Sequence, residues 1–151
     1  AVGRPPIHLV MPKGLGSGVP LIQHGKHGQR DSQAGAAVVV ECGQHFLKSA
    51  ADLATQVALE FVAHYGLIDR PAANAAPAQQ RRFELLETHV IKSTDFHFIK
   101  PVVGFEVFAR GELIAVNGPE EIRAPVDNCT IFMPSREATI GKEACYLTRP
   151  L

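Results

Sequence analysis

The spacing of hydrophobic residues changes along the chain, and its first clear signal is a continuous apolar run. Residues 36–40 read Ala-Ala-Val-Val-Val, without polar alternation. Such a β-branched run is typical of a strand that is buried on both faces, as in a parallel sheet. The run stops at Glu41, followed by Cys42 and Gly43. The pattern therefore predicts a buried strand with a carboxylate at its carboxyl end.

A helical pattern follows this predicted strand. Apolar residues recur every four positions at Leu53, Val57 and Phe61, which predicts an amphipathic helix. Ser49 precedes the pattern as a predicted N-cap, and Gly66 is expected to close the helix. Residues 36–66 therefore predict strand, loop and helix, which is one α/β unit.

The pattern changes again after residue 69. Residues 70–82 begin with small residues and two prolines and carry almost no large apolar side chain, so they are predicted to be a linker. From residue 83 onward, short apolar segments alternate with turn residues, which is typical of β structure: 85–92, 104–110, 112–116, 129–133 and 144–148. A tight reversal is expected at Arg110-Gly111, and no long helix is expected after residue 84. The predicted organisation is the end of an α/β domain (1–69), a linker (70–82) and a small β-sandwich or barrel domain (83–151).

Composition and charge exclude several classes of function. The 151 residues are 46% hydrophobic and 20% charged, with fifteen basic and fifteen acidic residues, so the chain is expected to fold and not to bind nucleic acid. The longest apolar stretch, residues 34–40, is far shorter than the roughly 20 residues that span a bilayer. Three scattered cysteines favour a reducing compartment, and we expect a cytoplasmic protein. The chain lacks both an initiator Met and a signal peptide, so we expect it to be the latter part of a longer polypeptide.

Glu41 is the main candidate for chemistry. Open α/β sheets place their ligand sites outside the carboxyl ends of strands, and a carboxylate there can act as a general base. The alternative is that Glu41 caps the following turn or pairs with a surface lysine.

The neighbouring residues supply candidates for substrate contacts. Gln44 and His45 follow Glu41 closely, and His45 can line the same pocket or simply pack in its loop. Arg30 is a candidate receptor for a substrate carboxylate, with pairing to Asp31 as the alternative.

Two other chemistries are less favoured. A zinc site made of His24, His27 and Glu41 is a less favoured interpretation. The two histidines lie in a predicted loop, and their spacing is not that of a helical zinc motif. Cys42 more often acts as an inert buried residue than as a nucleophile.

Two stretches resemble one known family. Residues 37–44, Ala-Val-Val-Val-Glu-Cys-Gly-Gln, followed by the predicted helix, resemble the segment around the catalytic glutamate of the aspartoacylase and succinylglutamate desuccinylase family. Residues 127–134 and 141–147 resemble the closing strands of that family's smaller β domain. The resemblance covers most of residues 20 to 151.

The resemblance implies a zinc-dependent amidohydrolase with a carboxypeptidase-like α/β domain, which removes the acyl group from a small-molecule N-acyl amino acid. It implies that Glu41 is the acid/base, and it places Arg30 near the family's carboxylate-binding arginine. The family holds zinc through a His-x-x-Glu pair and a later His, yet none of the seven histidines here has Glu three residues on. We therefore expect no metal ligand in this chain, zinc ligands upstream of residue 1, and no activity from the chain alone.

Alternative interpretations remain open. The β region also resembles the flattened barrel of biotinyl and lipoyl carrier domains, although Pro134-Ser135-Arg136 stands where the modified lysine is expected. A regulatory domain that kept the fold and lost the zinc is a third alternative. The sequence leaves open the acyl group, the amino acid and whether the protein is a homo-oligomer.

Overall fold

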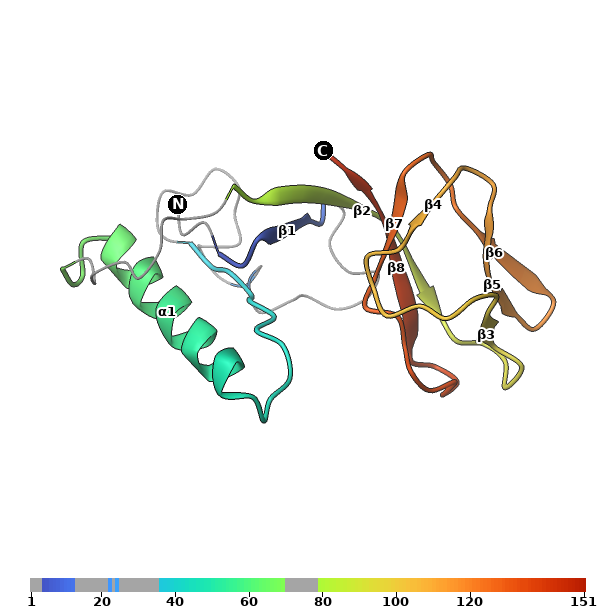
Figure 1. The fold of residues 1–151 in the computed structure, drawn as a ribbon, viewed down its shortest axis with the longest axis horizontal. Helices are drawn as coiled ribbons and strands as arrows, with labels where there is room; N and C mark the ends of the chain where they lie inside the picture. Colours follow the sequence, from blue (N-terminus) through green and yellow to red (C-terminus); the bar gives the residue numbers. More distant parts are fainter. Residues whose placement is uncertain (1–3, 13–21, 23, 25–35, 70–78) are drawn as a thin grey trace. The chain divides into compact units, whose positions relative to one another are not determined.

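The computed structural model describes residues 4–12, 22, 24, 36–69 and 79–151 (Figure 1). The chain divides into two compact units. The first comprises Ala1–His8 and Gly18–Arg81, and the second comprises Leu9–Ser17 and Arg82–Leu151. The first unit contains the helix, and most of the strands lie in the second.

The predicted helix is present as α1 (Lys48–His64). Val57 is buried, with Leu53 and Phe61 half-buried on the same face, as the spacing of four residues predicts. The helix ends in a Schellman motif, in which Gly66 has a φ of 71° and its N–H donates to the Ala63 carbonyl oxygen. The Arg4 guanidinium lies 3.4 Å from the Glu60 carboxylate and ties the start of the chain to the helix.

The predicted N-cap of this helix is wrong. Leu47, and not Ser49, occupies the N-cap position, and no side chain caps the helix. A turn explains the difference, because the Leu47 N–H donates to the Gln44 carbonyl oxygen and the Leu47 carbonyl oxygen accepts from the Ala50 N–H. The helix therefore begins directly out of a backbone turn.

The predicted buried strand at residues 36–40 is also wrong in this structure. Residues 36–42 have no regular secondary structure, and Val38 and Val39 are 55% and 62% exposed. A strand that is buried on both faces needs neighbouring strands for its backbone groups and layers above and below it. The described residues of the first unit supply no such sheet around the run, which leaves most of it in solvent.

Two sheets supply the strands of the second unit, and their printed pairings from β2 to β8 are antiparallel. The five-stranded sheet has the order β1-β2-β8-β7-β4, with β1 (Ile7–Val10), β2 (Arg81–Val90), β8 (Glu143–Pro150), β7 (Cys129–Phe132) and β4 (Val107–Phe108). The three-stranded sheet has the order β3-β5-β6, with β3 (His97–Phe98), β5 (Leu113–Asn117) and β6 (Glu120–Arg123). Within the described part of residues 79–151 there is no helix, which confirms the predicted β-rich region.

Both sheets contribute to one hydrophobic core. Ile131 and Leu147 from the five-stranded sheet and Ile114 from the three-stranded sheet are fully buried in the same cluster. The predicted reversal at Arg110-Gly111 is present as a turn, but it joins β4 and β5, which lie in different sheets. The turn is therefore a corner between sheets, as in a β-sandwich.

Buried polar side chains connect the strands of this unit. The Asn117 side chain, 2% exposed, accepts from the Lys92 N–H and donates to the Val90 carbonyl oxygen, both at 2.9 Å. The Thr148 hydroxyl donates to the Thr130 carbonyl oxygen at 2.8 Å across β7 and β8. These contacts satisfy polar groups in the core and define where β2 and β5 end.

The predicted linker is only partly described. β2 begins at Arg81, within the residues 70–82 predicted to be a linker, and residues 70–78 lie outside the described part of the chain. No helix among the described residues is long and apolar enough to cross a membrane.

Candidate functional site

Glu41 lies in the exposed segment that leads into α1. Its side chain is in solvent, and it makes no hydrogen bond or ion pair with any described residue. The predicted alternative, in which Glu41 pairs with a surface lysine, does not occur among those residues. Among the described residues, none competes with a ligand for the Glu41 carboxylate, which can accept a hydrogen bond.

A shallow open hollow follows Glu41 directly. Its lining comprises Gly43, Gln44, His45 and Phe46, and its volume is about 450 Å³. The left-handed backbone of Gly43, with a φ of 105°, and the turn from Gln44 to Leu47 give the hollow its shape. The structure thus brings Gln44 and His45, two of the predicted substrate-contacting residues, into one surface next to Glu41.

Phe46 is the residue of this hollow that the sequence interpretation missed. Its side chain is 99% exposed, whereas aromatic side chains usually bury most of their surface. Its place after Gln44-His45 was visible in the sequence, but the exposure of its ring follows only from the turn. The Phe46 ring is therefore an exposed apolar surface on this hollow.

The remaining predicted ligands fall largely outside the structure. Arg30 and His27 lie outside the described residues, and His24 is exposed. The described residues contain no group of three His, Cys, Asp or Glu side chains that can hold a metal ion. They therefore do not fit the zinc that the family resemblance implies, and we derive no chemical step through a metal from them.

The cysteines divide into one accessible and two inert thiols. Cys42 is half-buried, and its thiol donates weakly to the Val40 carbonyl oxygen at 3.8 Å. Burial raises the pKa of the Cys129 thiol to about 11 and that of the Cys145 thiol to about 12. Both core thiols are therefore protonated at neutral pH and do not act as nucleophiles.

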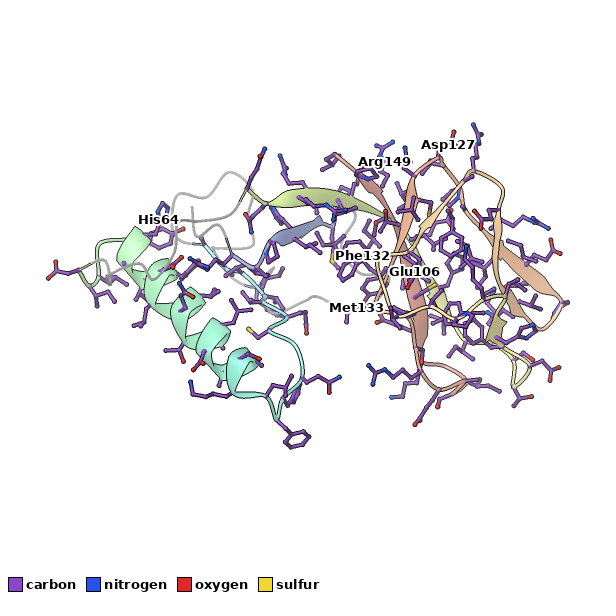
Figure 2. The ribbon with its side chains drawn as sticks, viewed as in Figure 1. His64, Glu106, Asp127, Phe132, Met133 and Arg149 are labelled. Carbon is purple, nitrogen blue, oxygen red and sulfur yellow. The ribbon has the colours of Figure 1, made fainter. Side chains whose placement is uncertain are left out.

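The loop before β4 carries the best-defined electrostatic feature of the second unit. The Glu106 carboxylate accepts from the backbone N–H groups of Val103 and Gly104, both at 2.9 Å. Desolvation raises the pKa of Glu106, but these hydrogen bonds and the charge of Lys100 outweigh it and hold the pKa below its usual value. Glu106, labelled in Figure 2, thus holds the shape of this loop.

Comparison with known proteins gives a match at the level of structure. No family model matches the sequence, and no curated protein matches it significantly. The fold resembles that of succinylglutamate desuccinylase from Vibrio cholerae, with a TM-score of 0.51 and 23% identity over 69% of this chain and 31% of that chain. A succinylglutamate desuccinylase from Vibrio parahaemolyticus gives a TM-score of 0.48 and 25% identity over 77% of this chain and 33% of that chain.

The two matches cover most of this chain but only part of each solved structure. The chain spans about one third of the length of the solved structures that it matches. Over most of its own residues, however, it is similar in fold to a part of the Vibrio cholerae enzyme. The resemblance to the succinylglutamate desuccinylases that the sequence predicted is therefore confirmed at the level of the fold.

Proposed function

We propose that this chain is the C-terminal portion of an amidohydrolase that removes the acyl group from an N-acyl amino acid. The observation that carries the proposal is the likeness in fold to a succinylglutamate desuccinylase over 69% of this chain. The Val-Glu-Cys-Gly segment and its position before α1 support the same assignment. In the proposal, residues 1–69 are the end of the catalytic domain and residues 83–151 form the small β domain. Residues 70–82 are the linker between these two domains.

Glu41 is the proposed acid/base of this reaction. Hydrolysis of an amide needs a group that takes a proton from the attacking water and returns a proton to the leaving amine. The Glu41 carboxylate is exposed and has no partner among the described residues, so it is free for both transfers. Gln44 and His45, which line the hollow after it, are proposed to contact the substrate, and Arg30 is proposed to bind a substrate carboxylate.

The proposed zinc belongs to the longer polypeptide. Because the described residues do not fit a metal, we propose that its ligands lie upstream of residue 1. We call the product of the complete reading frame that contains these 151 residues the parent polypeptide. We propose that it is a cytoplasmic enzyme with a small-molecule substrate.

The test uses the parent polypeptide and N-succinylglutamate, with N-acetylaspartate as a second substrate. We expect release of the free amino acid, which a chelator abolishes and added zinc restores. Absence of hydrolysis of both substrates by the zinc-loaded parent polypeptide would contradict the proposed function.

The role of Glu41 is tested separately in the same protein. Glu41→Gln keeps the size of the side chain and removes its basicity, so kcat is expected to fall by a factor of about 10² to 10⁴ with little change in KM. Asp69→Asn is the matched control, because it also neutralises an exposed carboxylate of the first unit, and it should retain kcat. Equal kcat values for the Glu41→Gln variant and the wild type would remove Glu41 from the mechanism.

A further inference from the structure

The hairpin between β5 and β6 carries a chemically labile dipeptide. Asn117, the last residue of β5, pairs with Glu120, the first residue of β6, so Gly118 and Pro119 form a two-residue turn (Figure 1). Asparagine is a thermolabile residue. When glycine follows it, the glycine nitrogen can attack the side-chain amide, because no Cβ hinders the approach. The hairpin is therefore a candidate site of deamidation.

The hairpin requires glycine at position 118. The φ angle of Gly118 is 66°, and a two-residue hairpin turn with proline in second place needs glycine in first place. A Cβ at this position would also lie 3.1 Å from the Ser93 Cβ, which is closer than ordinary van der Waals contact. Any other residue would therefore be strained by its backbone and by Ser93.

The same hairpin requires an amide at position 117. The Asn117 side chain is 2% exposed, and it accepts from the Lys92 N–H and donates to the Val90 carbonyl oxygen. A carboxylate cannot donate the second of these hydrogen bonds. The two requirements together place asparagine directly before glycine, so the labile sequence is a consequence of the fold of this unit.

The folded state protects the dipeptide from this reaction. For the attack, the Asn117 Cγ atom must turn toward the Gly118 nitrogen. Two hydrogen bonds of 2.9 Å hold the amide in another position, and burial keeps water from it. Both restraints are lost together when the β unit unfolds.

We propose that Asn117 is a deamidation site that reacts when the β unit unfolds and that then prevents refolding. The Gly118 nitrogen forms a bond to the Asn117 Cγ atom, and the bond from Cγ to Nδ2 breaks. Ammonia leaves with the proton of the Gly118 N–H, and a five-membered succinimide remains. Water then opens this ring to aspartate or to isoaspartate. The reaction is independent of the proposed hydrolase activity.

Neither product fits the folded hairpin. An aspartate at position 117 buries a carboxylate that cannot donate to the Val90 carbonyl oxygen, and burial of such a charge is costly. An isoaspartate adds a methylene to the backbone, which breaks the pairing of Asn117 with Glu120. Unfolding that lasts long enough for the reaction therefore becomes irreversible.

The experiment follows deamidation of the 151-residue chain at pH 8, in buffer and in urea, by mass spectrometry of proteolytic peptides. Asn128 is the internal reference, because it is exposed and precedes a cysteine. Gly118→Ala, measured in urea alone, tests the role of glycine. Ile131→Val, a core substitution on β7 and outside the hairpin, tests whether unfolding controls the reaction.

In urea, Asn117 should deamidate faster than Asn128, and Gly118→Ala should slow the reaction several-fold. In buffer, Asn117 should react about 100-fold or more slowly than in urea, because little of the chain is unfolded. Ile131→Val should raise the rate in buffer about five-fold, since it raises the unfolded fraction by about that factor.

The effect of the product is measured with two matched variants. Asn117→Asp should lower the Tm by about 4 °C or more. Asn128→Asp makes the same chemical change at an exposed residue and should keep the wild-type Tm.

Four outcomes overturn the proposal. Equal rates at Asn117 in buffer and in urea would show that the fold does not protect it. An unchanged rate in Ile131→Val would show that the reaction does not pass through unfolding. Faster reaction at Asn128 than at Asn117 in urea would remove the role of Gly118. A wild-type Tm for Asn117→Asp would show that the product still folds.

Discussion

At the scale of single residues, Asn117 shows how one side chain joins two elements. Its buried amide satisfies the carbonyl oxygen of Val90, the last residue of β2, and the N–H of Lys92, two residues further on. The five-stranded sheet therefore connects to the end of β5 through this side chain.

Removing this amide should destabilise the β unit. Asn117→Ala removes the amide from two partly buried hydrogen bonds, to the Lys92 N–H and the Val90 carbonyl oxygen, which costs about 1 to 3 kcal/mol of the free energy of unfolding. The neighbouring Glu120→Gln only breaks an exposed pair with Lys92, so its cost should stay below about 1 kcal/mol. Urea denaturation measures both variants, and equal losses would show that the Asn117 network is not a buried one.

The two core thiols predict a loss of stability at alkaline pH. Their pKa values in the folded chain, about 11 and about 12, lie above the ordinary value of 9.0. Since the unfolded chain releases these protons first, the stability they contribute is complete below pH 9 and is lost as the pH rises toward 11 to 12. The slope should approach about 1.4 kcal/mol per pH unit for each thiol.

Alkylation with iodoacetamide at pH 8 independently tests the burial of the same two thiols. We expect one fast-reacting cysteine in the native chain, Cys42, and three in denaturant, because Cys129 and Cys145 are fully buried. Rapid native labelling of either core cysteine would contradict the burial that raises its pKa.

The stability that Glu106 contributes is expected to depend on pH with the opposite sign. Because the pKa of its carboxyl group is lowered, its contribution to stability is complete above the usual value of 4.5 and is lost as the pH falls below it. Screening by solvent limits this contribution to about 0.5 to 1 kcal/mol. Glu106→Gln should lower the Tm at pH 7 and leave it closer to the wild type at pH 3. A Tm difference that does not shrink on acidification would show that the charge of Glu106 does not hold the loop.

At the scale of elements, the sequence predicted those whose stabilising contacts lie close by. Helix α1 follows from Leu53, Val57 and Phe61 on one face and from Gly66 at its end. Strands β2, β4, β5, β7 and β8 follow from short apolar segments and turn residues, whereas β3 and β6 lie outside the predicted segments. Residues from both sheets meet in one core, and the predictions are confirmed where pattern and packing agree.

Residues 36–40 also have a clear apolar pattern, but no strand among the described residues pairs with them. A run of valines predicts a strand with neighbouring strands in a sheet. The sequence pattern does not show whether those neighbouring strands are present. The exposure of Phe105 and Met133 was missed for a related reason. The left-handed φ angles of Phe105 and Met133 arise from loop contacts, and no local signal marks bulky residues that adopt them. Gln44 and His45, by contrast, lie beside Glu41 because they follow it in sequence.

The exposed run can be tested with a pair of substitutions in the isolated chain. Val38→Thr should leave the helical unfolding transition at 222 nm unchanged, because Val38 already lies in solvent. Val57→Thr, which places a hydroxyl on the buried face of α1, should lower the stability of the helix by about 1 to 2 kcal/mol. A comparable loss for Val38→Thr would mean that the run is packed in the isolated chain after all.

At the scale of the whole molecule, the two units share one property. Each exposes apolar side chains that the described residues do not cover: Val38, Val39 and Phe46 in the first unit, and Val103, Phe105, Val107 and Met133 in the second. Glu41, the proposed acid/base, also needs an activated water. The proposed function therefore demands a catalytic domain that the described residues do not supply.

The last prediction follows from that demand. The 151-residue chain alone, with or without added zinc, should hydrolyse neither N-succinylglutamate nor N-acetylaspartate. The described residues do not provide three metal ligands, and a carboxylate takes a proton from water efficiently near neutral pH when a metal has lowered the pKa of that water to about 7. Glu41 lies in solvent beside an open hollow, which neither excludes water nor positions an amide. Amino acid release by the isolated chain, removed by a chelator and by Glu41→Gln, would show that the site is complete within these residues.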